Sequence, residues 1–117
     1  MIGGYDASSV TINGKKHRSS VVFSNQRLPE AWPEGGSGDF LSAANSLPDQ
    51  VKPQEGVILF GTGASQIFPE VAIRRLWAQA GLIVEVMDTA AACRTFNLLA
   101  SEGRDVVAAL FIQEKDQ

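Results

Sequence analysis

The side chains best placed for chemistry lie at a short bend that follows a continuous apolar run. Glycines in this bend permit positive φ and close approach of a ligand to the backbone. If the bend opens outside the carboxyl end of a parallel strand, its amides could hold a small anion or a carbonyl group. The bend lacks the third glycine of a dinucleotide fingerprint and the lysine of a nucleotide-triphosphate loop, so a plain strand-to-helix turn is favoured. The candidate binding residues are Gly61, Thr62, Gly63, Ser65 and Gln66.

A second bend, at Asp88 and Thr89, follows the next apolar run and would extend the same pocket. Either side chain also serves as a helix N-cap, which stabilises a protein by about 1 kcal/mol and is sufficient to explain its presence. Cys93 comes one turn later, where the helix dipole would lower the thiol pKa and favour a thiolate. The one histidine, His17, lies in a predicted N-terminal hairpin, so a packed thiol is favoured and no catalytic residue is assigned.

Two further polar features accompany these bends. Glu85 interrupts an apolar strand, and strand alternation places its carboxylate on one face with Ile83 and Met87. Burial of an unpaired carboxylate costs on the order of several kcal/mol, so Glu85 must reach an edge or a partner such as Arg94 or Arg104. The helix after the second bend carries a polar stripe, which faces solvent or binds a protein partner: Arg94, Asn97 and Ser101.

Alternating strands and helices must position these bends. Continuous apolar runs at 56–60, 82–87 and 105–112 predict strands that are covered on both faces. Helical spacing predicts a helix over 69–80, with Pro69 in its first turn, and another over 89–102; Gly81 and Gly103 end them. Two right-handed crossovers make the three strands parallel. Both bends should then open at the same end of one sheet.

The first half of the chain carries different signals. Asn13-Gly14 is typical of a type I′ turn and predicts an antiparallel hairpin of residues 9–12 and 15–23. Residues 28–53 contain four prolines and are predicted to be mostly loop. Within them, Asp39 is expected to cap a short helix over 40–47 that Pro48 ends. Trp32 is expected to cover the core like a lid.

The composition indicates one ordinary folded domain, residues 1–117, with a loop-rich segment at 29–53. The chain has 117 residues, of which 44% are hydrophobic and 20% charged, and its formal net charge is -3. Because it has no dense basic stripe, nucleic acid is not expected as a partner. The single cysteine suits a reducing compartment. No apolar run approaches the roughly 18 residues of a membrane-spanning helix.

Much of the chain resembles one family. The combination of "GTGASQIF" at 61–68 with "GLIVEVMDTAAACRTFNLLASEGRDVVAALF" at 81–111 resembles the small α/β domain family of the mitochondrial NADH:ubiquinone oxidoreductase complex assembly factor 3 and its uncharacterised bacterial and archaeal relatives. The stretch "SVTINGKKHRSSVVF" at 9–23 is similar to the opening hairpin of that family. The resemblance implies a three-layer β/β/α single domain, with an N-terminal hairpin followed by strand-helix-strand-helix-strand. Phe96 stands where a tyrosine is common in the family.

The resemblance implies no catalytic residue and no cofactor. For the mitochondrial relative it implies a role in building a membrane respiratory complex through protein contacts. We therefore expect a non-enzymatic binding module with a protein partner. The alternative is a small-molecule enzyme or sensor whose pocket uses both bends and Cys93, and a third hypothesis is a homodimer through the polar helix face or a hairpin edge. We expect a bacterial cytoplasmic protein, and a mitochondrial one only if a presequence has been removed.

Overall fold

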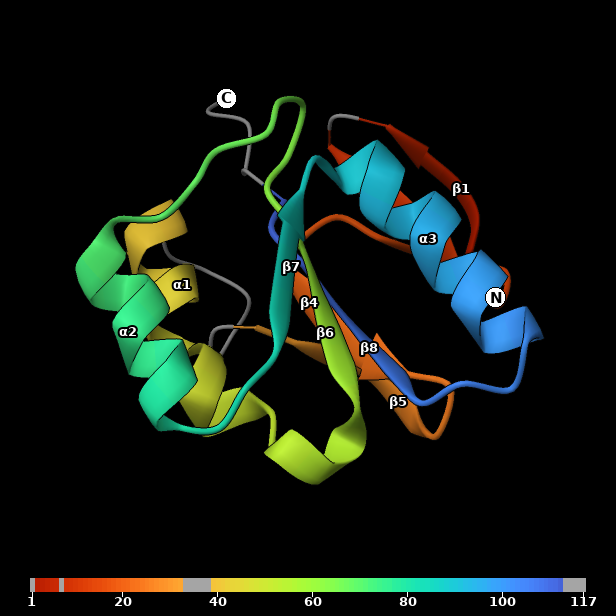
Figure 1. Ribbon diagram of the computed structural model, residues 1–117. Coiled ribbons are helices and arrows are strands. Elements are labelled where there is room, and N and C mark those ends of the chain that lie inside the picture. Colours follow the sequence, from red (N-terminus) through yellow and green to blue (C-terminus); the bar gives the residue numbers. More distant parts are fainter. Residues whose placement is uncertain (1, 7, 33–38, 113–117) are drawn as a thin grey trace.

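The centre of the molecule is a five-stranded mixed sheet (Figure 1). The computed structural model describes residues 2–6, 8–32 and 39–112. The strands of the central sheet are β4 Val21–Ser24, β5 Arg27–Ala31, β6 Val57–Gly61, β7 Val84–Met87 and β8 Val106–Leu110. They lie in the order β5-β4-β8-β6-β7, with β6 parallel to both β7 and β8. The prediction of three parallel strands is therefore confirmed, and β4 and β5 extend them as an antiparallel pair.

A second, smaller antiparallel sheet comes from the start of the chain. It consists of β1 Ile2–Asp6, β2 Ser9–Ile12 and β3 Lys15–His17. Asn13 and Gly14 take φ values of 51° and 85°, which confirms the predicted turn. The predicted second strand over 15–23 is wrong as one strand, because the chain leaves the small sheet after His17 and enters the central sheet at Val21. Ser20 fixes this crossing: its buried hydroxyl accepts from the Ile112 amide at 2.8 Å.

Both faces of the central sheet are covered (Figure 1). The helices are α1 Phe40–Gln50, α2 Val71–Gln79 and α3 Thr89–Ser101, with a short 3₁₀ turn, η2, at Pro53–Glu55. One face packs against α1 and α2, and the other packs against α3 and the small sheet. The predicted fold class, an α/β domain with a β layer in front of the parallel strands, is confirmed. The layer opposite α1 and α2 holds α3 as well as strands.

The core on the α1 and α2 side is organised around Phe60. The rings of Trp32, Phe40 and Trp77 have their centroids 5.5, 5.6 and 5.6 Å from that of Phe60. Such aromatic pairs stabilise a core beyond the area that they bury. Trp32 is fully buried, in agreement with its predicted place over the core.

The predicted loop-rich segment contains more regular structure than expected. Residues 27–31 form β5, and α1 continues through Pro48 to Gln50 instead of ending at Leu47. The predicted cap is correct, because the Asp39 carboxylate accepts from the Ser42 amide at 2.8 Å. Proline has no N–H for the carbonyl four residues earlier. That carbonyl, of Ala44, instead accepts from the indole Nε1 of Trp77 at 2.8 Å, so tertiary packing supplies the missing donor.

The predicted strand over 82–87 is an edge strand, not a strand covered on both faces. β7 has only β6 beside it in the described part of the chain. α3 packs chiefly over β6 and β8, so Ile83 is 69% exposed and Glu85 is exposed. Sequence pattern failed here because burial of a strand depends on its place in the sheet order.

The helices on the two faces begin close to their predicted positions. α2 starts at Val71, two residues after Pro69, and its inward side chains are Ile73 and Trp77. Leu76, predicted to face inward, is 39% exposed. Within the described residues, no helix is long and apolar enough to cross a membrane.

The two tryptophans give a matched test of this core. Trp77→Phe removes the indole donor to Ala44 and leaves that carbonyl unpaired beside Pro48, whereas Trp32 Nε1 is buried without a partner among the described residues. We expect Trp77→Phe to lower the free energy of unfolding by about 1–2 kcal/mol more than Trp32→Phe does. Urea denaturation followed by fluorescence measures both variants, since each retains one tryptophan. Equal losses, or a larger loss for Trp32→Phe, would show that the Ala44 carbonyl does not need this donor.

Candidate functional site

The two predicted bends lie side by side at the end of the sheet where β6 and β7 finish, here called the carboxyl rim. Gly61 is paired with Met87 in the parallel register, so both strands end at the same level. The Gly63 amide donates to Thr89 Oγ1 at 2.9 Å, and the Thr89 amide donates to the Gly63 carbonyl at 2.9 Å. The sequence therefore located the bends correctly relative to each other.

The polar groups of the first bend are largely bonded within the protein. Thr62 Oγ1 lies 2.6 Å from the Ser65 carbonyl and accepts from the Ile67 amide at 3.2 Å. Gln66 Nε2 donates to the Val86 carbonyl at 2.9 Å. Thr62 is buried, while Ser65 and Gln66 lie at the surface. The bend thus has the bonding pattern of a closed turn.

Gly61 is required by close packing. A Cβ at this position would lie 2.9 Å from Leu110 Cδ2, 3.1 Å from Thr89 Oγ1 and 3.2 Å from Thr89 Cα. The start of α3 therefore rests directly on the end of β6. This contact explains the glycine without a ligand, as the plain-turn interpretation predicts.

Asp88 and Thr89 both serve the helix start. The Asp88 carboxylate accepts from the Ala91 amide at 2.7 Å and is the N-cap of α3. Thr89 is buried, with 7% of its surface exposed, and its hydroxyl is bonded to Gly63. These bonds supply the capping energy that the sequence predicted and engage one oxygen of each side chain in the fold.

Cys93 is a packed thiol. It is 1% exposed, and burial raises its pKa to about 11, with Arg94 opposing only part of that rise. The predicted lowering of its pKa by the helix dipole is wrong, because desolvation outweighs the dipole at this depth. His17 lies in β3, where burial and then Lys15 lower its pKa, and no hydrogen bond between described residues joins it to Cys93.

The polar stripe on α3 holds the small sheet in place. Asn97 Oδ1 accepts from the Ile2 amide at 3.0 Å, and its Nδ2 donates to the Ile2 carbonyl at 2.9 Å, so the side chain binds β1 as a neighbouring strand would. Arg94 donates to the Tyr5 hydroxyl at 3.3 Å, also on β1. Ser101 donates to the Leu98 carbonyl of its own helix at 2.7 Å. Two of the three residues predicted for a partner surface therefore contact the first strand of the same chain.

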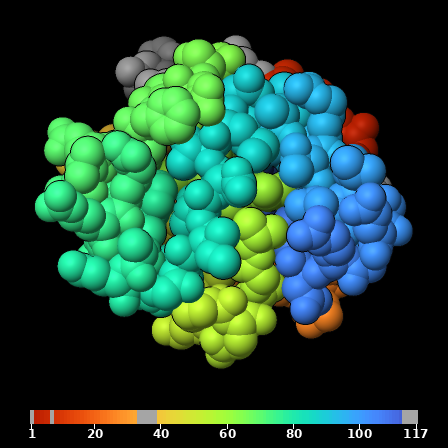
Figure 2. Space-filling model, in the orientation of Figure 1, coloured from red at the N-terminus to blue at the C-terminus, as the bar shows by residue number. Residues whose placement is uncertain are grey.

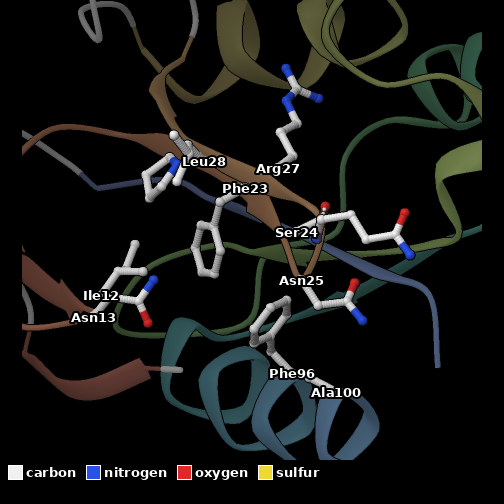
Figure 3. A pocket seen from close by; sticks show the side chains of 11 residues that line it. Ile12, Asn13, Phe23, Ser24, Asn25, Arg27, Leu28, Phe96 and Ala100 are labelled. Carbon is white, nitrogen blue, oxygen red and sulfur yellow. Dashed lines mark hydrogen bonds between the residues drawn. The ribbon is translucent and has the colours of Figure 1, made fainter. Parts of the chain in front are cut away.

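Sequence patterns missed a groove on the side of the small sheet (Figure 3). Its volume is about 520 Å³, and the rings of Phe23 and Phe96 pack edge to face in it with centroids 4.9 Å apart. Arg27 also lines the groove, but its guanidinium bonds to Glu55 and the Gln50 carbonyl. The groove is therefore a mainly neutral hollow, built from segments too far apart in the chain for any local pattern to reveal.

The described residues contain no group of three or more His, Cys, Asp or Glu side chains that could hold a metal ion.

Glu85, which the sequence predicted to reach an edge or a partner, reaches the edge: it is exposed on β7 and has no ion pair with a described residue. Arg94 and Arg104 are not its partners. The Arg104 carbonyl instead accepts from Asn25 Nδ2 at 2.9 Å.

Cys93 should behave as an inert thiol in the folded chain. Its folded pKa of about 11 lies above the ordinary value of 9.0, so at pH 8 its thiolate fraction is about a hundredfold below that of an unfolded cysteine. We expect negligible labelling by a disulfide reagent at pH 8 until denaturant is added.

The same shift makes stability depend on pH. Because the thiol pKa is higher in the folded than in the unfolded chain, its contribution to stability is fully present below pH about 9 and is lost as pH rises through about 11. Cys93→Ala should not show this loss of stability at alkaline pH. Rapid labelling of the folded chain would contradict a buried, inert thiol.

Asn97→Ala tests the attachment of β1. Removal of both hydrogen bonds to Ile2 should lower the free energy of unfolding by about 1–2 kcal/mol and expose the β1 amides to hydrogen exchange. The control is Ser101→Ala on the same helix, which loses a bond within its own turn and should change stability by less than about 0.5 kcal/mol. If β1 stays protected in Asn97→Ala, its pairing with β2 is sufficient to hold it.

Known proteins are similar to this chain in sequence and, where a structure is known, in fold. NADH dehydrogenase (ubiquinone) 1 alpha subcomplex assembly factor 3 of Xenopus tropicalis is 36% identical over 91% of this chain, which spans 57% of the length of that protein. An uncharacterized protein of Rhodobacter capsulatus is 34% identical over 93% of this chain and 82% of its own length. A crystal structure from Bordetella parapertussis is 28% identical and superimposes with a TM-score of 0.77, covering 96% of this chain and 94% of the other. A family model matches residues 2–111, and the chain belongs to that family, described as a protein of unknown function (DUF498/DUF598).

Proposed function

We propose that this chain is a non-enzymatic binding module that assists the assembly of a membrane respiratory complex through protein contacts. The observation that carries the proposal is the likeness to assembly factor 3 of NADH dehydrogenase, at 36% identity over 91% of this chain for the frog protein. The chain corresponds to 57% of that relative, so the shared activity must lie in this domain for the proposal to hold.

The state of the candidate chemical groups supports binding over catalysis. Thr62 and Thr89 are bonded within the carboxyl rim, and Asp88 caps α3. The Cys93 thiol is buried, and burial raises its pKa to about 11. A nucleophile needs exposure and a base, and this thiol has neither among the described residues. The polar side chains predicted to form a pocket therefore serve the fold.

Large apolar side chains at the surface support a docking role. Leu28 is 80% exposed, Ile83 69%, Phe68 64% and Leu98 58%. Exposed apolar side chains that lie together in one patch mark sites of protein interaction. Phe68 lines the cleft beside β7 together with Leu82 and Val84, and Ile83 directly precedes β7. We propose the bacterial cytoplasm as the location, which suits a reduced cysteine.

Deletion of the gene in its host tests the assembly role. We expect the mature NADH dehydrogenase complex to decrease on native gels of the membranes, with smaller intermediates accumulating. Wild-type chain and Cys93→Ala should restore the complex equally, because the thiol has no chemical part in the proposed role. Normal complex levels in the deletion strain would contradict the assembly role, and restoration by wild type but not by a folded Cys93→Ala would favour an enzyme.

A further inference from the structure

We propose that β7 binds an extended segment of a protein partner as an added strand, with a basic residue beside Glu85 and an apolar side chain in the cleft between β7 and α2. The inference rests on the proposed docking role and names its surface and the chemistry of its partner. Figure 2 shows the β7 segment open at the surface between α2 and α3. Addition of a strand to an open edge is a general mode of peptide recognition.

The backbone of β7 has hydrogen-bonding groups that face away from β6. The Ile83 carbonyl accepts from the Ile58 amide, and the Met87 carbonyl accepts from the Thr62 amide, both at 2.9 Å. Carbonyl directions alternate along a strand, so those of Val84 and Val86 point outward. The bond from Gln66 Nε2 to the Val86 carbonyl shows that this outward side is reachable by a donor.

A cleft of about 450 Å³ lies beside this edge and would receive side chains of the added strand. Its lining is mostly apolar and consists of Phe68, Trp77, Ala78, Leu82, Val84 and Val86, together with Arg74 and Glu85. Arg74 Nε donates to the Pro69 carbonyl at 3.2 Å. Val84 and Val86 pack on the core cluster of α1 and α2, so they define the face of β7 on which the cleft lies. Alternate side chains of an added strand point to opposite faces. One set would therefore enter the cleft, and the other would lie on the face of Ile83 and Glu85, the second of which also borders the cleft.

Glu85 determines the charge of the partner. It is the charged residue of β7, it is exposed, and it has no ion pair with a described residue. Like charges directly opposite on paired strands are destabilising, and opposite charges are favourable. If a second copy paired its β7 antiparallel with Val84 opposite Val86, Glu85 would face its own counterpart. A basic segment of a different protein satisfies the same edge without this repulsion.

Other sheet edges in the described part of the chain are better protected than β7. The main chain of β1 at Ile2 is bonded by Asn97, and β3 carries Lys15 and Lys16. β5 contains Pro29, which has no N–H to donate. Lysines, prolines and covering groups are the devices that prevent strand addition. Among the described residues, the outward side of β7 is contacted by the exposed Gln66 side chain, and Glu85 is the one charge on the strand, so this edge admits a basic segment.

Two synthetic peptides test the inference with the purified chain. The first alternates valine and lysine around a central phenylalanine, and the second has glutamate in place of every lysine. We expect the lysine peptide to bind at least about tenfold more tightly, and Glu85→Lys to reverse this order. Backbone amide shifts should change along residues 82–88. Failure of the lysine peptide to bind, or a preference that Glu85→Lys leaves unchanged, would overturn the proposal.

A second pair of variants separates strand addition from charge attraction alone. The Val86 amide points away from β6, so Val86→Pro removes an outward donor while keeping the ladder to β6. We expect it to weaken the lysine peptide by roughly tenfold or more, whereas Leu28→Thr on β5 should leave binding unchanged. If Val86→Pro fails to fold, a lysine peptide with N-methyl groups on alternate backbone nitrogens takes its place, because it lacks N–H donors along one edge. Equal binding of the methylated and the unmethylated lysine peptides would exclude backbone pairing.

The peptide-binding measurement and the gene deletion in the host test separate claims. Peptide binding at β7 with normal assembly in the deletion strain would remove the respiratory role and retain the docking edge. An assembly defect without peptide binding would retain the role and overturn this inference. Sedimentation that shows a dimer dissociated by Val86→Pro would also overturn it, because β7 would then bind a second copy of the chain.

Discussion

The structure depends on covering β6 and β8 on both faces. All five residues of β8 are fully buried, and three of the five residues of β6 have at most 1% of their surface exposed. Strands of this kind are stable only when apolar layers lie above and below them. α1 and α2 provide one layer, and α3 with the small sheet provides the other. The second layer is made of two separate pieces, so it needs contacts that join them.

The contacts that join these pieces, and that seat α3 on the end of β6, use polar residues that otherwise suggest a functional site. Asn97 ties β1 to α3 through the main chain of Ile2, and Thr89 ties α3 to the loop after β6. Gly61 lets the helix start touch the strand end. Each of these residues has a structural partner within the described chain. The same residue types at the same strand ends would look identical in sequence if they bound a ligand, so only coordinates separate the two cases.

Sequence predicted the elements whose signals are local and missed those whose causes are distant. Asn13-Gly14 and the caps Asp39 and Asp88 act on neighbouring backbone, and all were located correctly. α1 runs past Pro48 because Trp77, 33 residues from Ala44, supplies a donor. The break before Val21 and the edge position of β7 depend on sheet order, which no window of sequence contains. The Phe23 and Phe96 groove was missed for the same reason.

An edge of four residues suits a partner that must be released. β7 is short, and one cleft beside it limits the number of side chains that a bound segment can bury. Small interfaces are typical of transient encounters, while permanent subunits bury far more surface. Backbone pairing gives such an edge affinity for many extended sequences, and Glu85 with the cleft selects among them. In the proposed assembly role, a subunit held by one unpaired strand would be released when that strand finds its place in the finished complex.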